Sequence, residues 1–397
     1  MSQLPAELLD WIVGYLTQGR DLKACSLASR ALKPRARLNL NWVLVPRSAE
    51  AFQQLLSSPE CKILDQIRSV EIRRYYWTDR DKVFEHIAPK MVESPYVEKL
   101  KLTISALLDD PRNDMFLTQN FLSAFPNVTY LELSCKFVHH GQPDAPARLA
   151  DTIAMFPALR ELVISSLDDM FMTNQEQWTL PPPPALSSLT LCPSVVGRML
   201  SWLDGNDRMS SVTSLTMPLA WGNETFHPLP ISLIARVFAP VYVNLQHLDI
   251  KLEICNAEAP LPDLLNLSRF PALRTVVVTD FKRIDLNSTE RMIFDPDRIA
   301  TFLTRLQAAS LETLDIAVDV DLYSRCKTET AKRTNWGLVD AHFAEARFAR
   351  LRRVTLKLVE DGLPRPSFAR PASFEKFAGE FPLLAARGLF RFIDTSI

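Results

Sequence analysis

The chain has 397 residues, more than one compact hydrophobic core normally holds, so we expect either two to three domains or one extended repeat architecture. Its 45 Lys and Arg residues nearly cancel its 46 Asp and Glu residues without forming a basic block, which gives no electrostatic support to a nucleic-acid or anionic-membrane partner. The six cysteines lack CxxC and Cys/His ligand spacing and are predicted to be reduced thiols of an intracellular protein.

The N-terminal segment LPAELLDWIVGYL (4–16) is strongly apolar and has a helical rhythm. On a helical wheel its apolar side chains fill an arc of about 200°, roughly twice the stripe of a helix that its own core covers on one side. Glu7 and Asp10, with no cation before Arg20, argue against a signal peptide, and no later run is long enough to span a bilayer. We therefore expect a helix covered on two sides, by its own bundle and by a partner, in a soluble cytoplasmic or nuclear protein.

Two shorter helical patterns follow this segment. LKACSLASRAL (22–32) has Asp21 as its expected N-cap, and RARLNLNW (35–42) is opened by Pro34. The three segments contain too little apolar content for a self-sufficient core, so they are predicted to form a docking module. An internal capping helix is the alternative that the pattern alone leaves open.

One short unit recurs along the rest of the chain, as in FPNVTYLELS (125–134), FPALRELVIS (156–165) and FPALRTVVVT (270–279). Each copy has an LxxLxL core that alternates as a strand, and most gaps hold helical patterns, such as 117–125, 147–156, 231–239 and 298–309. This alternation predicts parallel strands with crossover connections. The middle apolar residue of the core recurs at Val70, Leu100, Leu131, Leu162, Leu189, Leu215, Leu248, Val276, Leu314 and Val354.

These repeats resemble the leucine-rich-repeat family over residues 60–360. The resemblance implies an α/β fold in which a short N-terminal helical module precedes an irregular leucine-rich-repeat solenoid, with a parallel concave sheet and helices on the convex side. The family's consensus Asn or Cys is absent after each strand, so the turns must be satisfied without an asparagine ladder. An ordinary open α/β sheet is the alternative, although the chain has neither a GxGxxG nor a P-loop motif. The polyproline stretch 180–186 is interpreted as a stiff connector rather than as a ligand for an aromatic groove.

The N-terminal residues resemble the F-box motif at Leu4, Pro5, Glu7, Leu8, Leu9, Ile12 and Leu16, and then at Asp21, Leu22, Cys25, Leu27, Ser29 and Arg30. Leu32 stands where the family usually has Trp, and residues 34–59 resemble the region after the box in many fungal F-box proteins. The resemblance implies an F-box at 1–45, a linking segment at 46–60, and a solenoid with a C-terminal cap at 61–397.

In function, the resemblance implies the substrate-recognition subunit of an SCF-type cullin-RING E3 ubiquitin ligase. The F-box would bind a Skp-type adaptor, and through it cullin, while the solenoid binds a target protein. Such a receptor is no enzyme and needs no cofactor, because its role is to bring the target close to the ligase. The residues expected to contact the adaptor are Leu4, Pro5, Leu8, Leu9, Ile12, Leu16, Leu22 and Leu27.

Few catalytic or metal-binding motifs can be recognised in this sequence. His139 and His140 form the only adjacent histidine pair and have no carboxylate or thiolate beside them, and GxSxG and HExxH do not occur. Two further readings stay open: a leucine-rich-repeat interaction protein that holds the adaptor without cullin, and an enzyme on an unrecognised α/β fold.

Residues that contact a target are expected on the concave side of the sheet and in the loops. In LDIAVDVDL (314–322), alternation places Asp315, Asp319 and Asp321 on one face, either as an acidic patch for a basic target or as a solvated edge. Trp178, Trp221 and Trp336 lie in long gaps and are the other candidates, since aromatic residues are enriched at binding hot spots. The residues expected to point to the concave side are Glu71, Arg73, Lys101, Glu132, Val163, Thr190, Thr216, Asp249, Lys251, Val277, Asp315 and Lys357.

Overall fold

The structure is a computed structural model. It describes residues 13, 19–28, 32–33, 36, 41–44, 54, 67–74, 96–107, 122, 125–138, 145–167, 178, 180–192, 195–221, 243–254, 267–280, 297–319, 335–359 and 379–394. The chain divides into two compact units, Met1–Leu186 (unit 1) and Ser187–Ile397 (unit 2).

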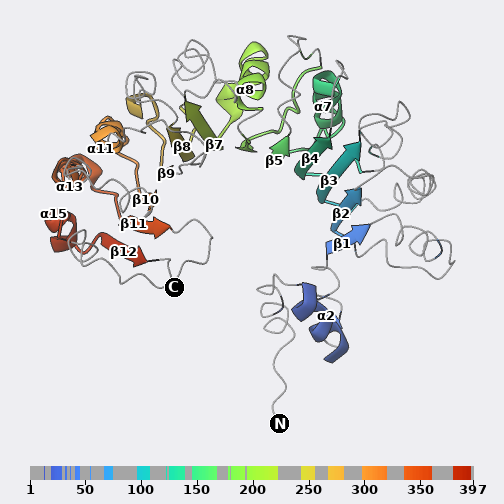
Figure 1. Cartoon of the computed structure of the whole chain (residues 1–397), viewed down its shortest axis with the longest axis horizontal. Coiled ribbons are helices and arrows are strands. Elements are labelled where there is room, and N and C mark those ends of the chain that lie inside the picture. Colours follow the sequence, from blue (N-terminus) through green and yellow to red (C-terminus); the bar gives the residue numbers. More distant parts are fainter. Residues whose placement is uncertain are drawn as a thin grey trace. The chain divides into compact units, whose positions relative to one another are not determined.

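Unit 1 contains strands that pair in parallel and in chain order (Figure 1). These are β1 (Asn41–Leu44), β2 (Ser69–Arg74), β3 (Lys99–Leu107), β4 (Tyr130–Val138) and β5 (Glu161–Leu167). The middle residues predicted from the repeat lie opposite one another across the ladder, in the order Val70, Leu100, Leu131 and Leu162. All four are fully buried, so the repeat marks a continuous apolar row.

Unit 2 continues the same arrangement with parallel strands in chain order. They are β6 (Ser188–Thr190), β7 (Ser214–Trp221), β8 (His247–Ile254), β9 (Thr275–Asp280), β10 (Thr313–Asp319), β11 (Arg353–Val359) and β12 (Phe390–Asp394). The remaining predicted middle residues again align, in the order Leu189, Leu215, Leu248, Val276, Leu314 and Val354. A one-residue slip would turn each apolar side chain to the opposite face, so burial of this row fixes the register.

In the part of the chain that the structure describes, helices lie in several of the connections between strands, as the alternating pattern predicts. They are α7 (Ala145–Ala154) in unit 1 and α8 (Val196–Gly205), α11 (Asp297–Thr304), α13 (Trp336–Phe343) and α15 (Pro382–Ala386) in unit 2, with 3-10 turns η4 (Met209–Ser211), η5 (Leu267–Arg269) and η7 (Ala346–Phe348). The four described helices of unit 2 lie on one side of its strands (Figure 1). Helices expected at 147–156 and 298–309 correspond to α7 and α11, whereas the expected helix at 231–239 lies outside the described residues.

A recurring turn precedes most strands and uses the FPxL part of the repeat. The N–H of the fourth residue donates to the carbonyl of the first, as Leu159 donates to Phe156 at 3.0 Å and Leu273 donates to Phe270 at 3.2 Å. The first residue is fully buried in both cases. Pro183 takes this place before β6, where the Leu186 N–H donates to its carbonyl at 3.2 Å. The polyproline stretch therefore supplies the turn of a repeat, with Pro182 and Pro183 buried.

A second backbone pattern ties most of the described turns to the next one. The carbonyl of the residue two places before the middle residue accepts two N–H groups from the following repeat. The Arg68 carbonyl accepts from Glu98 at 2.9 Å and from Lys99 at 3.0 Å, and the Gln246 carbonyl accepts from Arg274 at 2.8 Å and from Thr275 at 2.9 Å. Backbone groups thus satisfy one another on the N-terminal side of the strands.

The described fold is an α/β leucine-rich-repeat-like solenoid, as the sequence predicts, with two additional strands. Strand β1 pairs Trp42 with Val70, and β12 pairs Phe390 with Val354. The helix expected over 35–42 is therefore wrong at its last two residues, because Asn41 and Trp42 are in β1. The predicted boundaries at residues 45 and 60 stay a prediction, although β1 shows that the sheet begins before them.

Candidate interaction surfaces

The N-terminal module has a small apolar core around helix α2 (Gly19–Ala28). Val13, Leu22 and Ala36 are buried together, with exposures of 0%, 2% and 0%, and Cys25 packs against them. The helix begins at Gly19, so Asp21, expected as its N-cap, lies within the first turn. A carboxylate there still interacts favourably with the positive end of the helix.

Leu32 also packs against this core. Its carbonyl accepts the N–H of Ala36 at 3.0 Å, which is the spacing of one helical turn. Leu32 therefore anchors the segment after α2 through both its side chain and its backbone.

The residues predicted to contact an adaptor are placed unequally. Leu4, Pro5, Leu8, Leu9, Ile12 and Leu16 lie outside the described residues. Leu22 is part of the module's own core, whereas Leu27 is 87% exposed on the same helix. An almost fully exposed Leu beside a packed core is an apolar group that a partner could cover. Of the two described residues, only Leu27 is available at the surface.

The open face of each sheet is the side that carries the residues directly before and after the buried middle residues. In unit 1 this face is charged and internally paired. Arg73 Nε lies 2.6 Å from Glu71 Oε1, and Lys101 Nζ lies 2.6 Å from Glu132 Oε1. The Tyr130 hydroxyl donates to Glu132 Oε2 at 3.2 Å. Burial and the neighbouring Glu132 carboxylate raise the pKa of Tyr130 to about 12.

In unit 2 the open face has a different balance of charge. Val277 on β9 lies between Asp249 on β8 and Asp315 on β10. Burial raises the pKa of Asp249, and the cations Lys251 and Lys357 offset this only in part. One buried oxygen of Asp249, Oδ1, has no hydrogen-bond partner among the described residues. A carboxylate in this situation is held in its charged form less strongly than one in water.

Asp315 is instead neutralised by the next strand. Lys357 Nζ donates to its Oδ2 at 3.0 Å, and Arg353 Nε lies 3.8 Å from its Oδ1. Burial acts to raise the pKa of Asp315, but hydrogen bonds from Lys357 and Thr355 and the two positive charges lower it overall. Asp315 thus pairs with both cations, with Lys357 through a hydrogen bond and with Arg353 through charge alone, since its buried Oδ1 has no hydrogen-bond partner among the described residues.

The other predicted target residues do not gather at one place in the described structure. The side chains of Asp319 and Trp221, which end β10 and β7, are not described, and Asp321 lies wholly outside the described residues. Trp178 is half-buried. Trp336, expected in an exposed loop, is the first residue of α13 and is only 2% exposed, with its ring 5.5 Å from that of Phe381. It therefore packs in the core of the last repeats.

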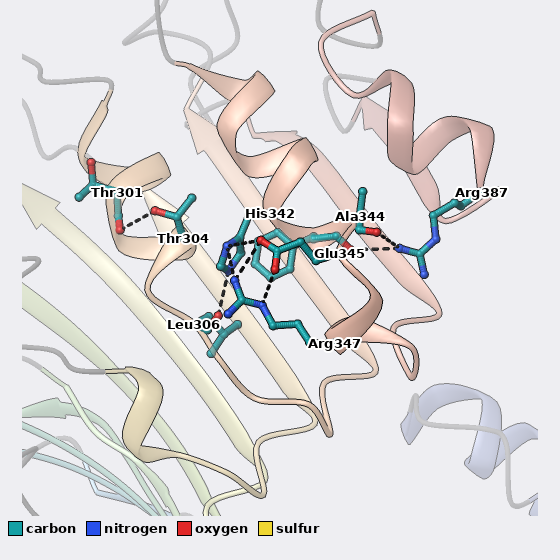
Figure 2. Close-up of polar contacts among 9 residues, drawn as sticks. Thr301, Thr304, Leu306, His342, Ala344, Glu345, Arg347 and Arg387 are labelled. Carbon is teal, nitrogen blue, oxygen red and sulfur yellow. Dashed lines mark hydrogen bonds and ion pairs between the residues drawn. The ribbon is translucent and has the colours of Figure 1, made fainter.

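The helical side of unit 2 carries a polar network that sequence reasoning missed (Figure 2). The His342 ring nitrogen Nε2 lies 2.9 Å from the Leu306 carbonyl, and Nδ1 lies 3.0 Å from an Arg347 nitrogen. Since a carbonyl only accepts and Arg only donates, Nε2 carries the proton and Nδ1 accepts, which describes a neutral imidazole. Burial is the main cause that lowers the pKa of His342. Glu345, 2.9 Å from Arg347, completes the network.

Two charged residues join α13 and α15 reciprocally. Asp340, which is 1% exposed, accepts the N–H groups of Leu383 and Leu384 at 2.8 Å each, at the N-terminus of α15. Arg387 donates from the end of α15 to the carbonyls of Phe343 and Ala344 at 3.2 and 3.1 Å, at the C-terminus of α13 (Figure 2). Each helix end thus receives the charge that its dipole favours.

Two further searches cover only the part of the chain that the structure describes. No helix there is both long and apolar enough to cross a bilayer. Within the same residues, no three His, Cys, Asp or Glu side chains come together as possible ligands of a metal ion.

Comparisons with known proteins give limited matches. No family model matches the chain, and no curated protein matches it. Among solved structures, a Bacteroides fragilis protein is similar at 14% identity and a TM-score of 0.37, with 90% of this chain and 74% of that chain covered. TLR13 in the TLR13–ssRNA13 complex is similar at 12% identity and a TM-score of 0.29, with 82% of this chain and 52% of that chain covered. This chain therefore spans about half the length of TLR13, and the fold assignment rests on the strand register and the recurring turn.

Proposed function

We propose that this chain is the substrate-recognition subunit of an SCF-type ubiquitin ligase. Its N-terminal module binds a Skp-type adaptor, and through it cullin, while the repeat solenoid binds the target protein. The chain itself performs no chemistry and holds no cofactor. It raises the effective concentration of the target near the ligase, which is a sufficient role for a binding subunit.

The observation that carries this proposal is the contrast on helix α2. One side of the helix supplies Leu22 to a small core, and the other presents Leu27 at 87% exposure. An exposed Leu contributes nothing to the module's own fold but gains about 1.5–3 kcal/mol when a partner buries it. The same helix carries four residues of the second half of the F-box resemblance, Asp21, Leu22, Cys25 and Leu27.

Co-expression with a Skp-type adaptor tests the docking step. We expect the wild-type chain to co-purify with the adaptor, Leu27→Glu to weaken the complex, and Leu8→Glu with Ile12→Glu to abolish it. A matched control is Leu338→Glu on α13, where Leu338 is also exposed, at 54%, but lies in unit 2. Circular dichroism would verify that every variant stays folded.

The proposal fails if the wild-type chain does not bind the adaptor, or if the folded Leu8→Glu, Ile12→Glu variant still does. Two alternatives make different predictions in the same assay. A leucine-rich-repeat interaction protein outside any ligase would bring down the adaptor without cullin. An enzyme on this fold would bring down neither and would require a pocket with converging polar groups.

A further inference from the structure

Three cations lie on the open face at the C-terminal end of unit 2. Arg353 and Lys357 are on β11 with Thr355 between them, and Arg391 on β12 lies directly opposite Thr355. On the other side, Asp315 of β10 is also opposite Thr355. The alternation of strands places all five side chains on one face.

The carboxylates around these cations do not balance them, because the described acids that act on them are Asp315 and, through Lys357, Asp249 on β8, two acids against three bases. Asp315 pairs with Lys357 and Arg353 at 3.0 and 3.8 Å, while Arg391 is exposed and makes no ion pair with the described residues. The acid also lies deeper than the bases, since the Asp315 side chain is 15% exposed against 34% for Lys357 and 43% for Arg353. What this patch presents to solvent is therefore positive charge.

Unit 1 shows that excess charge is not a general property of the open face. There Arg73 and Lys101 each meet a carboxylate of their own at 2.6 Å. Exposed surface pairs of this kind contribute little to folding. Here one acid pairs with two bases, and the third base, Arg391, makes no ion pair with the described residues, so these cations can contribute more to binding a ligand than to folding.

We propose that the open face of β11 and β12 binds an acidic, extended segment of the target polypeptide. Arg353 and Lys357 are separated by about 13 Å along the strand, which matches carboxylates four residues apart in an extended peptide. Arg391 lies about 5 Å to the side and offers a planar guanidinium for a two-pronged contact with a third carboxylate. Asp315 holds the first two cations in place. This inference rests on the proposed function, because it names the chemistry of the target that the solenoid selects.

A random twelve-residue peptide library tests the proposal, selected against the full chain co-expressed with the adaptor. We expect Asp and Glu to be enriched in the selected peptides at low salt. Arg353→Glu with Arg391→Glu should weaken binding of a selected acidic peptide at least about tenfold, because like charges would then face each other. Arg353→Gln with Arg391→Gln should weaken it less, and it separates loss of attraction from any folding defect.

The matched control is Arg350→Glu with Arg352→Glu. These arginines are exposed in and after the turn before β11 and give the same change in net charge off the open face. Selected peptides without acidic enrichment, no selected peptides, or equal weakening by both pairs would overturn the proposal. Adaptor co-purification of each variant keeps the two hypotheses apart: if the adaptor binds and acidic peptides do not, only the target chemistry is wrong.

Discussion

Asp340 is predicted to hold the last repeat of the chain in place. Replacing it with Ala removes a charged acceptor from two N–H groups, of Leu383 and Leu384, at 2.8 Å each. Hydrogen bonds to charged groups contribute about 1.5–3 kcal/mol each. Loss of a helix N-cap costs about 1 kcal/mol, but this figure describes the same bonds and is not added. Two bonds at the lower end of the range give an expected loss of about 3 kcal/mol in the free energy of unfolding. Asp340→Asn keeps one acceptor oxygen and should lose about half as much.

The loss should be local, since in a repeat protein each unit is stabilised mainly by its neighbours. Hydrogen exchange should show β12 amides losing protection in Asp340→Ala while those of β8 and β9 keep theirs, and urea unfolding should give the free energy. Glu345→Ala, which breaks an ion pair of a 48% exposed side chain, is the control and should cost less than about 1 kcal/mol. A loss below about 0.5 kcal/mol with unchanged β12 exchange would refute the capping argument.

Two titrations provide further predictions. Burial holds the pKa of His342 in the folded chain below its ordinary value of 6.5, so near that pH the unfolded chain binds more protons than the folded one. The free energy of unfolding should therefore fall as the pH drops below about 6.5. The slope should be at most about 1.4 kcal/mol per pH unit. Urea unfolding at several pH values should show this dependence reduced in His342→Gln, and an identical pH profile would contradict it. Tyr130 should titrate at about 12 in a phenolate absorbance difference against Tyr130→Phe, and Glu132→Gln should bring it only part of the way back to 10, because burial is the larger cause. A titration near 10 in the wild type would show that the hydroxyl is not held as described.

The strands were predictable because burial imposes a repeated apolar pattern. Ten middle residues were found by an LxxLxL core, and each has its partner in the observed ladder. The two strands that the pattern missed have a polar residue at the first apolar position of that core. This residue is Asn39 before β1 and Arg387 before β12. Arg387 is polar there because it caps α13, a role that only the neighbouring repeat reveals.

The interaction surfaces were less predictable from the sequence for a physical reason. Alternation tells which side chains share a face, but not which neighbours neutralise them. The sequence therefore left Asp315 either in an acidic patch or at a solvated edge, whereas it pairs with Lys357 and Arg353. Trp336 was expected in a loop, because it lies in a long gap between two predicted strands and the start of α13 within that gap was not recognised. The local signal was Asn335, whose side chain accepts the N–H of Leu338 at 3.3 Å as an N-cap.

The two faces of the unit 2 sheet differ in how much the fold depends on them. On the helical side, the buried Asp340 carboxylate accepts hydrogen bonds from two backbone N–H groups. Its removal leaves both donors without a partner. On the open face, Arg391 is exposed and the Arg353 side chain is 43% exposed although its Nε is buried, and surface charge pairs contribute about 0–1 kcal/mol. Charge reversal at these arginines should therefore leave the sheet folded, and a loss of acidic-peptide binding in that variant would measure recognition rather than stability.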